Sequence, residues 1–519
     1  MKRILYLTIL LVNAVALQAQ WATWESPVAN IIYSKCTQCH RTGGIAPFTL
    51  ESYSDAVSNN LSIQYAVTNK IMPPWPPDKD YRNFAHDRSL KAEEIDAIND
   101  WVNNGAPSGN LADAPLAPTF SSAWEIPAPD VTVRMPDYTS AATGYDEYRC
   151  FVMPSGITSD KYISEIEVIP GNRQAVHHVL VFQDPSGDAA ALDAATPEPG
   201  YESFGDAGTD NADLVGLWAP GGQKFTLPAG MGLKMNAGAD IVIQVHYPDG
   251  SAGLLDSTRI NIKFADGAFV REVFLDPLLY HYAPCISPAL IIPANTTRTF
   301  VETTNSSDIS PVKGTLLAVA PHMHLIGRNI TAYAVPPSGD TIPLIKIPNW
   351  DFHWQGMYFF QKLQPIELNT DVQAVAFYDN TSANPWNPSS PPQLVTLGEA
   401  TTDEMMLVYF LYTYYLPGDE DIIQDSTLLA SSINESVADH MQLNVFPNPA
   451  TEECFVELPV DDKLSSVGLY SITGQLVETS EINGEHILRI MTGNLPDGVY
   501  VAEIKGEKRS YTARVLIQP

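Results

Sequence analysis

Basic residues are scarce in this chain. Lysine and arginine together number 29, against 60 aspartates and glutamates, which gives a formal net charge of -31 at pH 7 over 519 residues. Nucleic acids and anionic membrane surfaces are bound through clustered Lys and Arg side chains. The composition therefore argues against both as partners, and the length predicts three or four domains.

Long apolar segments are equally scarce. The one at residues 4–16 follows Lys2 and Arg3 and precedes the small residue Ala19, which is the pattern of a cleaved signal peptide. It is shorter than the roughly 20 residues that cross a bilayer as a helix, and no other segment is long and apolar enough to span. We therefore expect an exported, soluble mature protein without a membrane span, in a compartment where thiols can oxidise.

Only five cysteines are present, and two of them stand in the motif CTQCH. In an exported protein this motif is the attachment signature of c-type haem, with thioether bonds from Cys36 and Cys39 and with His40 as the proximal iron ligand. A redox-active Cys-x-x-Cys is the alternative. Met72 in IMPPWPP is the candidate second axial ligand, because its prolines favour an extended loop; simple packing of Met72, or ligation by His86, are the alternatives.

The region 21–109 around this motif also carries a helix signal near its end. Ser89 is the predicted N-cap, an apolar face that includes Ile98 and Trp101 follows, and Gly105 stops the helix. Together with the haem motif, this pattern predicts a small all-α, monohaem cytochrome c domain.

From about residue 124 to 417 the chain changes to short β-prone runs. Examples are YISEIEVI, IVIQVHY and EMMLVYFLYTYY, punctuated by Gly, Pro and Asn. No convincing long amphipathic helix interrupts them, so we predict a mainly β, β-sandwich architecture for this part of the chain.

Five of the eleven histidines, with one methionine, form an ordered series in the β region. Each motif alone is weak evidence for a metal site, because the histidines of an HH or HxH motif more often lie in a core or on a surface. The order of the motifs along one β region is much more specific. Imidazole binds both copper oxidation states, whereas a thioether favours Cu(I). The series therefore predicts two unequal redox coppers, held by two groups of residues: His177, His178 and His246, and then His322, His324 and Met405.

The spacing of these histidines also predicts local geometry. His322 and His324 are two residues apart, so we expect them to project from the same face of one strand. Adjacent His177 and His178 would point to opposite faces of a regular strand. A bulge or a strand end is therefore needed to bring both of them together with His246.

The motifs VHHVLVF, QVHYPDG, PHMH and GEATTDEM, with YRCF around Cys150, resemble those of the copper type II, ascorbate-dependent monooxygenases. The resemblance implies two β-sandwich lobes that face each other across an open, solvent-filled cleft, each with one copper. It implies an electron-storing copper on the three-histidine group and a dioxygen-activating copper on the histidine–methionine group. Gln244 would lie next to the first group without binding metal.

The resemblance also implies the reaction. A substrate C–H bond is hydroxylated with dioxygen, giving an alcohol and water, and the second electron comes from the distant copper. Family members take electrons from ascorbate, whereas here the fused haem is a candidate donor, itself reduced by ascorbate or a redox protein. Two alternatives stay open: a non-enzymatic haem and copper electron-transfer or copper-binding surface protein, and a cytochrome that serves separate partners while a small reductant serves the coppers.

Substrate-binding positions differ from the peptide-amidating members of that family. Where those members have Arg, Asn and Tyr to hold a carboxylate, this chain has Ala320, Leu407 and Tyr409. Only the tyrosine matches, so Tyr409 is kept as a catalytic candidate. The two mismatches argue against a glycine-extended peptide as the substrate and leave small molecules, other peptides and carbohydrates as substrate classes. The stretch NWDFHWQGMYFF could line a binding surface, but sandwich core is the favoured interpretation, and His353 within it is not a predicted ligand.

An oxidising location permits a disulfide between two of the remaining cysteines, Cys150 and Cys285, although the sequence does not place them together. Cys454 has no assigned role.

The C-terminal region resembles the sorting domain of type IX secretion cargo, through NVFPNPA, GLYSITGQLV and NLPDGVYVAEI in order; an ordinary β module for adhesion is the alternative. The resemblance implies a small β-sandwich, passage through the periplasm and outer membrane of a Gram-negative bacterium with the secretion machinery as partner, and surface attachment or release. The predicted segments are a signal peptide (1–19), the cytochrome c domain (21–109), a linker (110–123), two monooxygenase lobes (124–275 and 276–417), a second linker (418–441) and the sorting domain (442–519).

Overall fold

The computed structural model of the chain divides into two compact units, Met1–Gln424 and Asp425–Pro519. The predicted signal peptide (1–19) and Cys285 lie outside the described residues, and no helix among the described residues is long and apolar enough to cross a membrane. The described residues are 21–44, 46–120, 125–220, 222, 224–267, 269–281, 288–398, 400–425, 441–443, 445–458, 464–471, 476–482, 486–496, 498–506 and 510–518.

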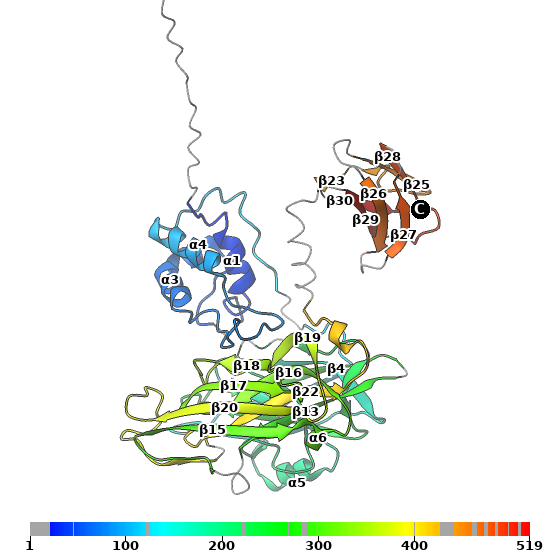
Figure 1. The fold of residues 1–519 in the computed structure, drawn as a ribbon. Helices are drawn as coiled ribbons and strands as arrows, with labels where there is room; N and C mark the ends of the chain where they lie inside the picture. Colours follow the sequence, from blue (N-terminus) through cyan, green and yellow to red (C-terminus); the bar gives the residue numbers. More distant parts are fainter. Residues whose placement is uncertain are drawn as a thin grey trace, which may run out of the picture. The chain divides into compact units, whose positions relative to one another are not determined.

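The first part of unit one is helical, as predicted (Figure 1). Trp24 and Trp101, both almost fully buried, lie in its apolar core. The predicted N-cap is wrong: the last helix begins at Ala92, where the Glu94 carboxylate accepts the Lys91 N–H at 2.7 Å, and Ser89 instead bonds Asp87. The helices are α1 (Val28–Lys35), α2 (Tyr53–Ser58), α3 (Asn60–Thr68) and α4 (Ala92–Asn103).

The rest of unit one is built of β-sheets, which confirms the predicted mainly β class. A nine-stranded sheet runs in the order β1-β12-β4-β9-β13-β22-β16-β19, with β8 beside β4. Its strands are β1 (Val131–Arg134), β4 (Lys161–Ile169), β8 (Phe225–Thr226), β9 (Met231–Met235), β12 (Arg259–Phe264), β13 (Arg271–Tyr280), β16 (Gly314–His322), β19 (Tyr358–Ile366) and β22 (Leu407–Tyr414).

Two smaller sheets cover this large sheet and make two apolar cores. A five-stranded sheet, in the order β6-β3-β10-β5-β7, shares one core with it, and a four-stranded sheet, β15-β20-β17-β18, shares the other. The two sandwich halves are thus joined by one continuous sheet. The strands are β3 (Glu147–Pro154), β5 (His178–Asp184), β6 (Tyr201–Glu202), β7 (Asp213–Trp218), β10 (Asp240–Tyr247), β15 (Thr296–Asn305), β17 (Gly327–Val335), β18 (Ile342–Ile347) and β20 (Asp371–Asn380).

Short elements complete unit one. Two strand pairs, β11 with β2 and β14 with β21, lie outside the three larger sheets. The elements are β2 (Tyr138–Thr139), β11 (Leu255–Asp256), β14 (Ile291–Ile292), β21 (Val395–Thr396), α5 (Asp188–Ala195), α6 (Ser306–Ile309) and a 3-10 turn (Asp419–Asp421).

Unit two contains a five-stranded sheet, β23-β30-β29-β26-β27, and a three-stranded sheet, β24-β25-β28. Cys454 is fully buried in its apolar core, so this thiol packs as a small apolar side chain. The strands are β23 (Met441–Gln442), β24 (Val445–Phe446), β25 (Glu453–Glu457), β26 (Leu464–Ser471), β27 (Leu476–Glu481), β28 (Ile487–Met491), β29 (Gly498–Gly506) and β30 (Ser510–Ile517).

Residues 75–88, between α3 and α4, dock the helical region on the β core. The Phe84 side chain is only 1% exposed and packs against Phe360 within the second apolar core. At the edge of this contact, the Asp78 carboxylate pairs with the Lys346 ammonium at 2.8 Å. The helical region is therefore held on the core by packing as well as by its chain connection.

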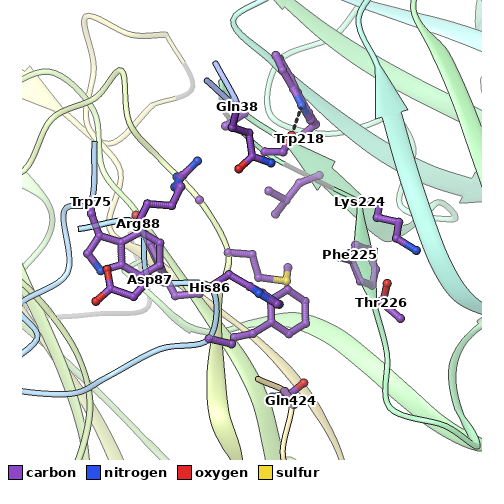
Figure 2. Close-up of a pocket in the computed structure, with 18 of the residues that line it drawn as sticks. Gln38, Trp75, His86, Asp87, Arg88, Trp218, Lys224, Phe225, Thr226 and Gln424 are labelled. Carbon is purple, nitrogen blue, oxygen red and sulfur yellow. Dashed lines mark hydrogen bonds between the residues drawn. The ribbon is translucent and has the colours of Figure 1, made fainter. Parts of the chain in front are cut away.

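A cavity of about 710 Å³ lies between the helical region and the β core (Figure 2). Trp75 and Arg88 of the helical region line one side, and Trp218 and Phe225 of the core line the other. Gln38, from the middle of the CTQCH motif, also reaches this space.

Candidate metal centres

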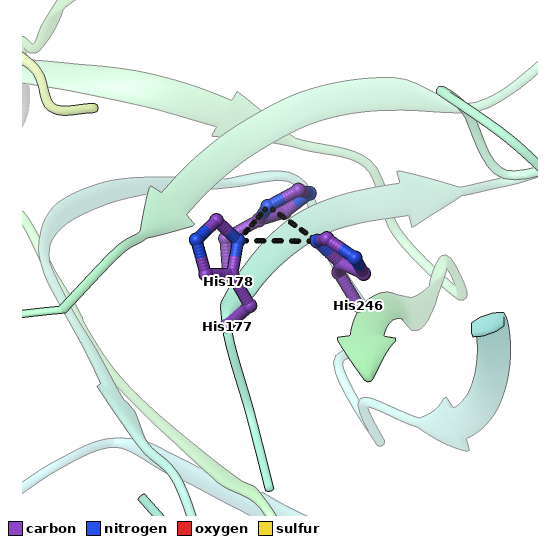
Figure 3. A group of neighbouring side chains, drawn as sticks. All are labelled: His177, His178 and His246. Carbon is purple, nitrogen blue, oxygen red and sulfur yellow. Dashed lines mark hydrogen bonds between the residues drawn. The ribbon is translucent and has the colours of Figure 1, made fainter. Parts of the chain in front are cut away.

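Three histidines converge on one point in the first sandwich half (Figure 3). The Nδ1 atoms of His177 and His178 are 3.3 Å apart, those of His177 and His246 are 3.1 Å apart, and those of His246 and His178 are 3.3 Å apart. The structure thus brings the first predicted group together.

The pairing of β5 with β10 produces this convergence. His178 is the first residue of β5 and lies directly opposite His246 in the antiparallel register. His177 precedes the strand, and its N–H donates to the His246 carbonyl at 2.9 Å. The expected strand end is therefore what turns two adjacent imidazoles toward the same point.

The geometry of the three nitrogens fits a metal ion. Metal–imidazole bonds of about 2.0 Å in a tetrahedral arrangement place ligand nitrogens roughly 3.3 Å apart, close to the separations of the three Nδ1 atoms. The buried Nε2 of His177 has no hydrogen-bond partner. Burial lowers the pKa of His177 to about 3 and that of His178 well below its usual value, which favours the neutral imidazole that metals bind.

Two residues that the sequence analysis missed support His246. An Asp146 carboxylate oxygen lies 3.3 Å from its Nε2, and the Tyr148 ring stacks on the imidazole with ring centres 4.3 Å apart. A carboxylate on the outer nitrogen orients an imidazole and makes the inner nitrogen a stronger ligand. No motif marks Asp146, because its contact with His246 depends on the fold.

The second predicted group assembles at adjacent strand ends of the other half. The rings of His322 and His324 are 5.0 Å apart. The expectation of one strand face is wrong, because β16 ends at His322 and His324 lies in the irregular segment between this strand and the turn at residues 325–326. Met405 stands two residues before Leu407, the first residue of β22, and Leu407 lies opposite His322 in the pairing of β22 with β16.

Hydrogen bonds fix the outer nitrogens of both rings. His322 donates from Nδ1 to the Gln355 side-chain oxygen at 2.5 Å, and His324 donates from Nδ1 to the Asp403 carbonyl at 3.2 Å. Each bond leaves Nε2 as the atom available to a metal. Gln355 belongs to NWDFHWQGMYFF, the stretch expected to be mainly core.

Glu404 ties the two segments of the second group together. Its buried carboxylate accepts the backbone N–H groups of His324 and Ile326 at 2.9 and 2.8 Å, and those of Gly327 and Met405 at 3.2 Å. Burial raises the pKa of Glu404 to about 8, against the opposing effect of these donors. The residue before Met405 therefore sets the position of Met405 relative to His324.

His177 and His178 of the first group and all three residues of the second group line one cavity of about 120 Å³. The Phe352 ring lies between them, with its centre 5.5 Å from that of His177 and 5.9 Å from that of His324. This arrangement differs from the wide cleft implied by the resemblance, because a C-terminal-lobe loop fills the space between the groups. The cavity lining also includes Gln244, Ala320, His353, Met405, Leu407 and Tyr409.

Gln244 supports the cavity wall. Its side-chain amide donates to the carbonyls of Ser203 and Asp206 at 3.1 and 2.6 Å, which holds the loop beside the first group. His353 bonds Asp351 at 2.9 Å and lies outside the three-histidine cluster. In the same stretch Trp350, Phe352 and Tyr358 are buried, as expected for core, whereas Trp354 lines the 710 Å³ cavity.

The helical region presents the CTQCH side chains in a form that suits haem attachment. Cys36 and Cys39 are free thiols. His40 donates from Nδ1 to the Phe48 carbonyl at 3.0 Å, which leaves Nε2 for iron. Met72 lies in the loop after α3, where its N–H bonds the Ala66 carbonyl at 3.3 Å; its role as axial ligand stays a prediction.

Cys150 is fully buried, and its thiol lies 3.6 Å from the Asp206 carbonyl. Its predicted partner Cys285 is outside the described residues, so the disulfide stays a prediction.

Family comparisons assign the β region. Residues 131–252 match the copper type II ascorbate-dependent monooxygenase N-terminal domain, and residues 279–436 match the C-terminal domain of the same enzymes. These residues belong to that monooxygenase family. Membership implies two copper ions. Residues 444–518 match the secretion system C-terminal sorting domain, which indicates export by type IX secretion.

Curated relatives are distant. The chain is 23% identical over 320 residues to DBH-like monooxygenase protein 1 of Gallus gallus, covering 58% of this chain and 49% of the relative. It is 23% identical over 326 residues to the Homo sapiens protein, covering 60% and 50%. The chain thus spans about half the length of these relatives. A solved structure of PNGF-II aligns at 8% identity over 55% of this chain and 65% of that one, with a TM-score of 0.24, which is too low to indicate a shared fold.

Proposed function

We propose that the protein is a secreted copper-dependent monooxygenase that hydroxylates a C–H bond of an organic substrate. The reaction balances as R–H plus dioxygen, two electrons and two protons, giving R–OH and water. The observation that carries the proposal is that the three-histidine group, through His177 and His178, and the whole histidine–histidine–methionine set line the same small cavity.

The two groups take different roles in this proposal. His177, His178 and His246 hold the copper that stores an electron. His322, His324 and Met405 hold the copper at which dioxygen and substrate meet, because a thioether favours the Cu(I) state that dioxygen requires. Tyr409, in the lining of the cavity, lies where it can contact substrate.

We include a covalent haem on Cys36, Cys39 and His40 as the source of electrons, since a c-type haem supplies one-electron transfer. The docking of residues 75–88 on the core supports this. So does Gln38 of the CTQCH motif, which lines the cavity between the helical region and the core together with Trp218.

Oxygen-18 labelling tests the function. Copper-loaded protein should insert one labelled oxygen atom into the product of a C–H substrate found by screening, and His178→Ala and His322→Ala should each abolish that product. His486→Ala is the control, because His486 is exposed and lies outside the cavity, and it should retain turnover. Oxygen uptake that never depends on an added substrate would favour the alternative, a non-enzymatic electron-transfer or copper-binding surface protein.

A further inference from the structure

The cavity at the ligand groups is too small for a whole organic substrate. Its volume is about 120 Å³, equivalent to roughly four water molecules at about 30 Å³ each. Small-molecule sites usually have volumes of roughly 300–1,000 Å³. The small cavity therefore has room for dioxygen and the reacting end of a substrate, and the remainder must lie elsewhere.

The 710 Å³ cavity adjoins the small one and has a suitable size. Residues 217–219 and 355–356 line both cavities. Gln355, which accepts the hydrogen bond from His322, is thus part of the wall between them. A molecule in the larger cavity would meet this wall directly beside the second ligand group.

Aromatic side chains dominate the chemistry of the larger cavity. Trp75 comes from the helical region, and Trp218, Trp354 and Tyr358 come from the core (Figure 2 shows Trp75 and Trp218 on its two sides). Trp75 packs edge-on against Tyr358 with ring centres 5.5 Å apart. Trp218 and Tyr358 are almost fully buried and form the wall, whereas the less buried Trp75 and Trp354 can offer flat apolar faces to a ligand that is itself flat.

The cationic groups around this cavity already have partners. The Lys35 ammonium donates to the Asp87 carbonyl at 3.2 Å, and the Lys224 ammonium pairs with Glu165 at 2.5 Å. The Arg88 guanidinium lies over the Trp75 ring, 5.7 Å from its centre. The carboxylates in the lining are also hydrogen-bonded, since Asp87 accepts the Ser89 N–H at 2.7 Å and Glu125 accepts the Lys224 N–H at 3.3 Å. The cavity therefore favours a neutral ligand over an ion.

We propose that the 710 Å³ cavity binds the body of the substrate, a neutral molecule with a flat aromatic ring system, whose reacting C–H end passes Gln355 toward His322. This inference rests on the proposed function and deepens it. The helical region then has a second role besides the haem, because its Trp75 forms part of the substrate site and helps determine specificity.

Binding of 2-naphthol to the full chain loaded with both haem and copper, measured by calorimetry, tests the inference apart from turnover. Trp75→Ala and Trp354→Ala should each weaken binding about five- to tenfold, and Thr226→Trp, which adds bulk at the cavity edge, should weaken it further. Trp21→Ala is the control, because Trp21 is 63% exposed and outside this cavity, and it should bind like the parent. The anionic 2-naphthalenesulfonate should bind more weakly than 2-naphthol.

Copper content, measured on each variant, separates the two proposals. Variants that keep two coppers yet bind 2-naphthol as tightly as the parent would overturn the cavity assignment and leave the monooxygenase proposal intact. Tighter binding of the sulfonate would overturn the neutral class. A parent protein that binds no copper would overturn the proposed function whatever its affinity for 2-naphthol.

Discussion

At the scale of single residues, Glu404 is where ligand placement and stability depend on the same group. Its buried carboxylate accepts four backbone N–H groups from the segments that carry His324 and Met405. Glu404→Ala would leave these buried donors without an acceptor, so we expect a loss of about 3–5 kcal/mol in the free energy of unfolding. Urea denaturation measures it. Glu404→Gln keeps one acceptor oxygen and should lose less free energy of unfolding. Glu198→Ala, at an exposed position, is the control and should change this free energy little. Equal stabilities for all three variants would contradict the role of Glu404 as the buried acceptor.

Met405 and its neighbour Met406 offer a matched pair at the same scale. Met405 lines the ligand cavity, whereas Met406 is only 1% exposed in the second apolar core. Met405→Leu should remove the sulfur signal from the X-ray absorption spectrum of the Cu(I) protein and cut turnover at least tenfold, with stability nearly unchanged. Met406→Leu should keep the sulfur signal and lower the free energy of unfolding by less than about 1.5 kcal/mol. A sulfur signal that survives Met405→Leu would remove Met405 from the ligand set.

At the scale of elements, residues 75–88 should control how firmly the helical region is held. Phe84 is buried against Phe360 in the second core. Phe84→Ala should therefore remove about 3–5 kcal/mol of stabilising free energy from the contact between residues 75–88 and the β core. Hydrogen exchange should then speed up over residues 75–88 and the start of β19 while α1 and α4 keep their protection. Tyr65→Ala, at a side chain that is 66% exposed, is the control. Uniformly faster exchange across the helices would mean that Phe84 stabilises the helical fold rather than its docking.

How much the sequence predicts also differs between elements and contacts. Periodicity and motif order predict the β class and the two ligand groups, because alternation along a strand and ligand spacing are local signals. Asp146, Phe352 and Gln355 were missed as neighbours of the ligands, because their contacts join residues far apart in the sequence and no local pattern marks them. The misplaced N-cap has a different cause: Glu94 caps the backbone at Lys91, where a lysine gives no capping signal.

At the scale of the whole molecule, the docked helical region makes electron transfer within one chain the expected route. If the proposed haem is present, reducing it without oxygen should be followed by its reoxidation by Cu(II), at a rate independent of protein concentration. Stopped-flow absorbance measures this, and copper-free protein is the control that should stay reduced. A rate proportional to protein concentration would mean that electrons pass between molecules.

The copper content of the purified mature protein and of two single variants tests the two copper sites most directly. We expect two coppers per chain in the parent, and one in each of His178→Ala and His322→Ala, with the copper–sulfur signal lost only in His322→Ala. One copper in the parent, or loss of both or neither in the variants, would contradict two separate and unequal sites.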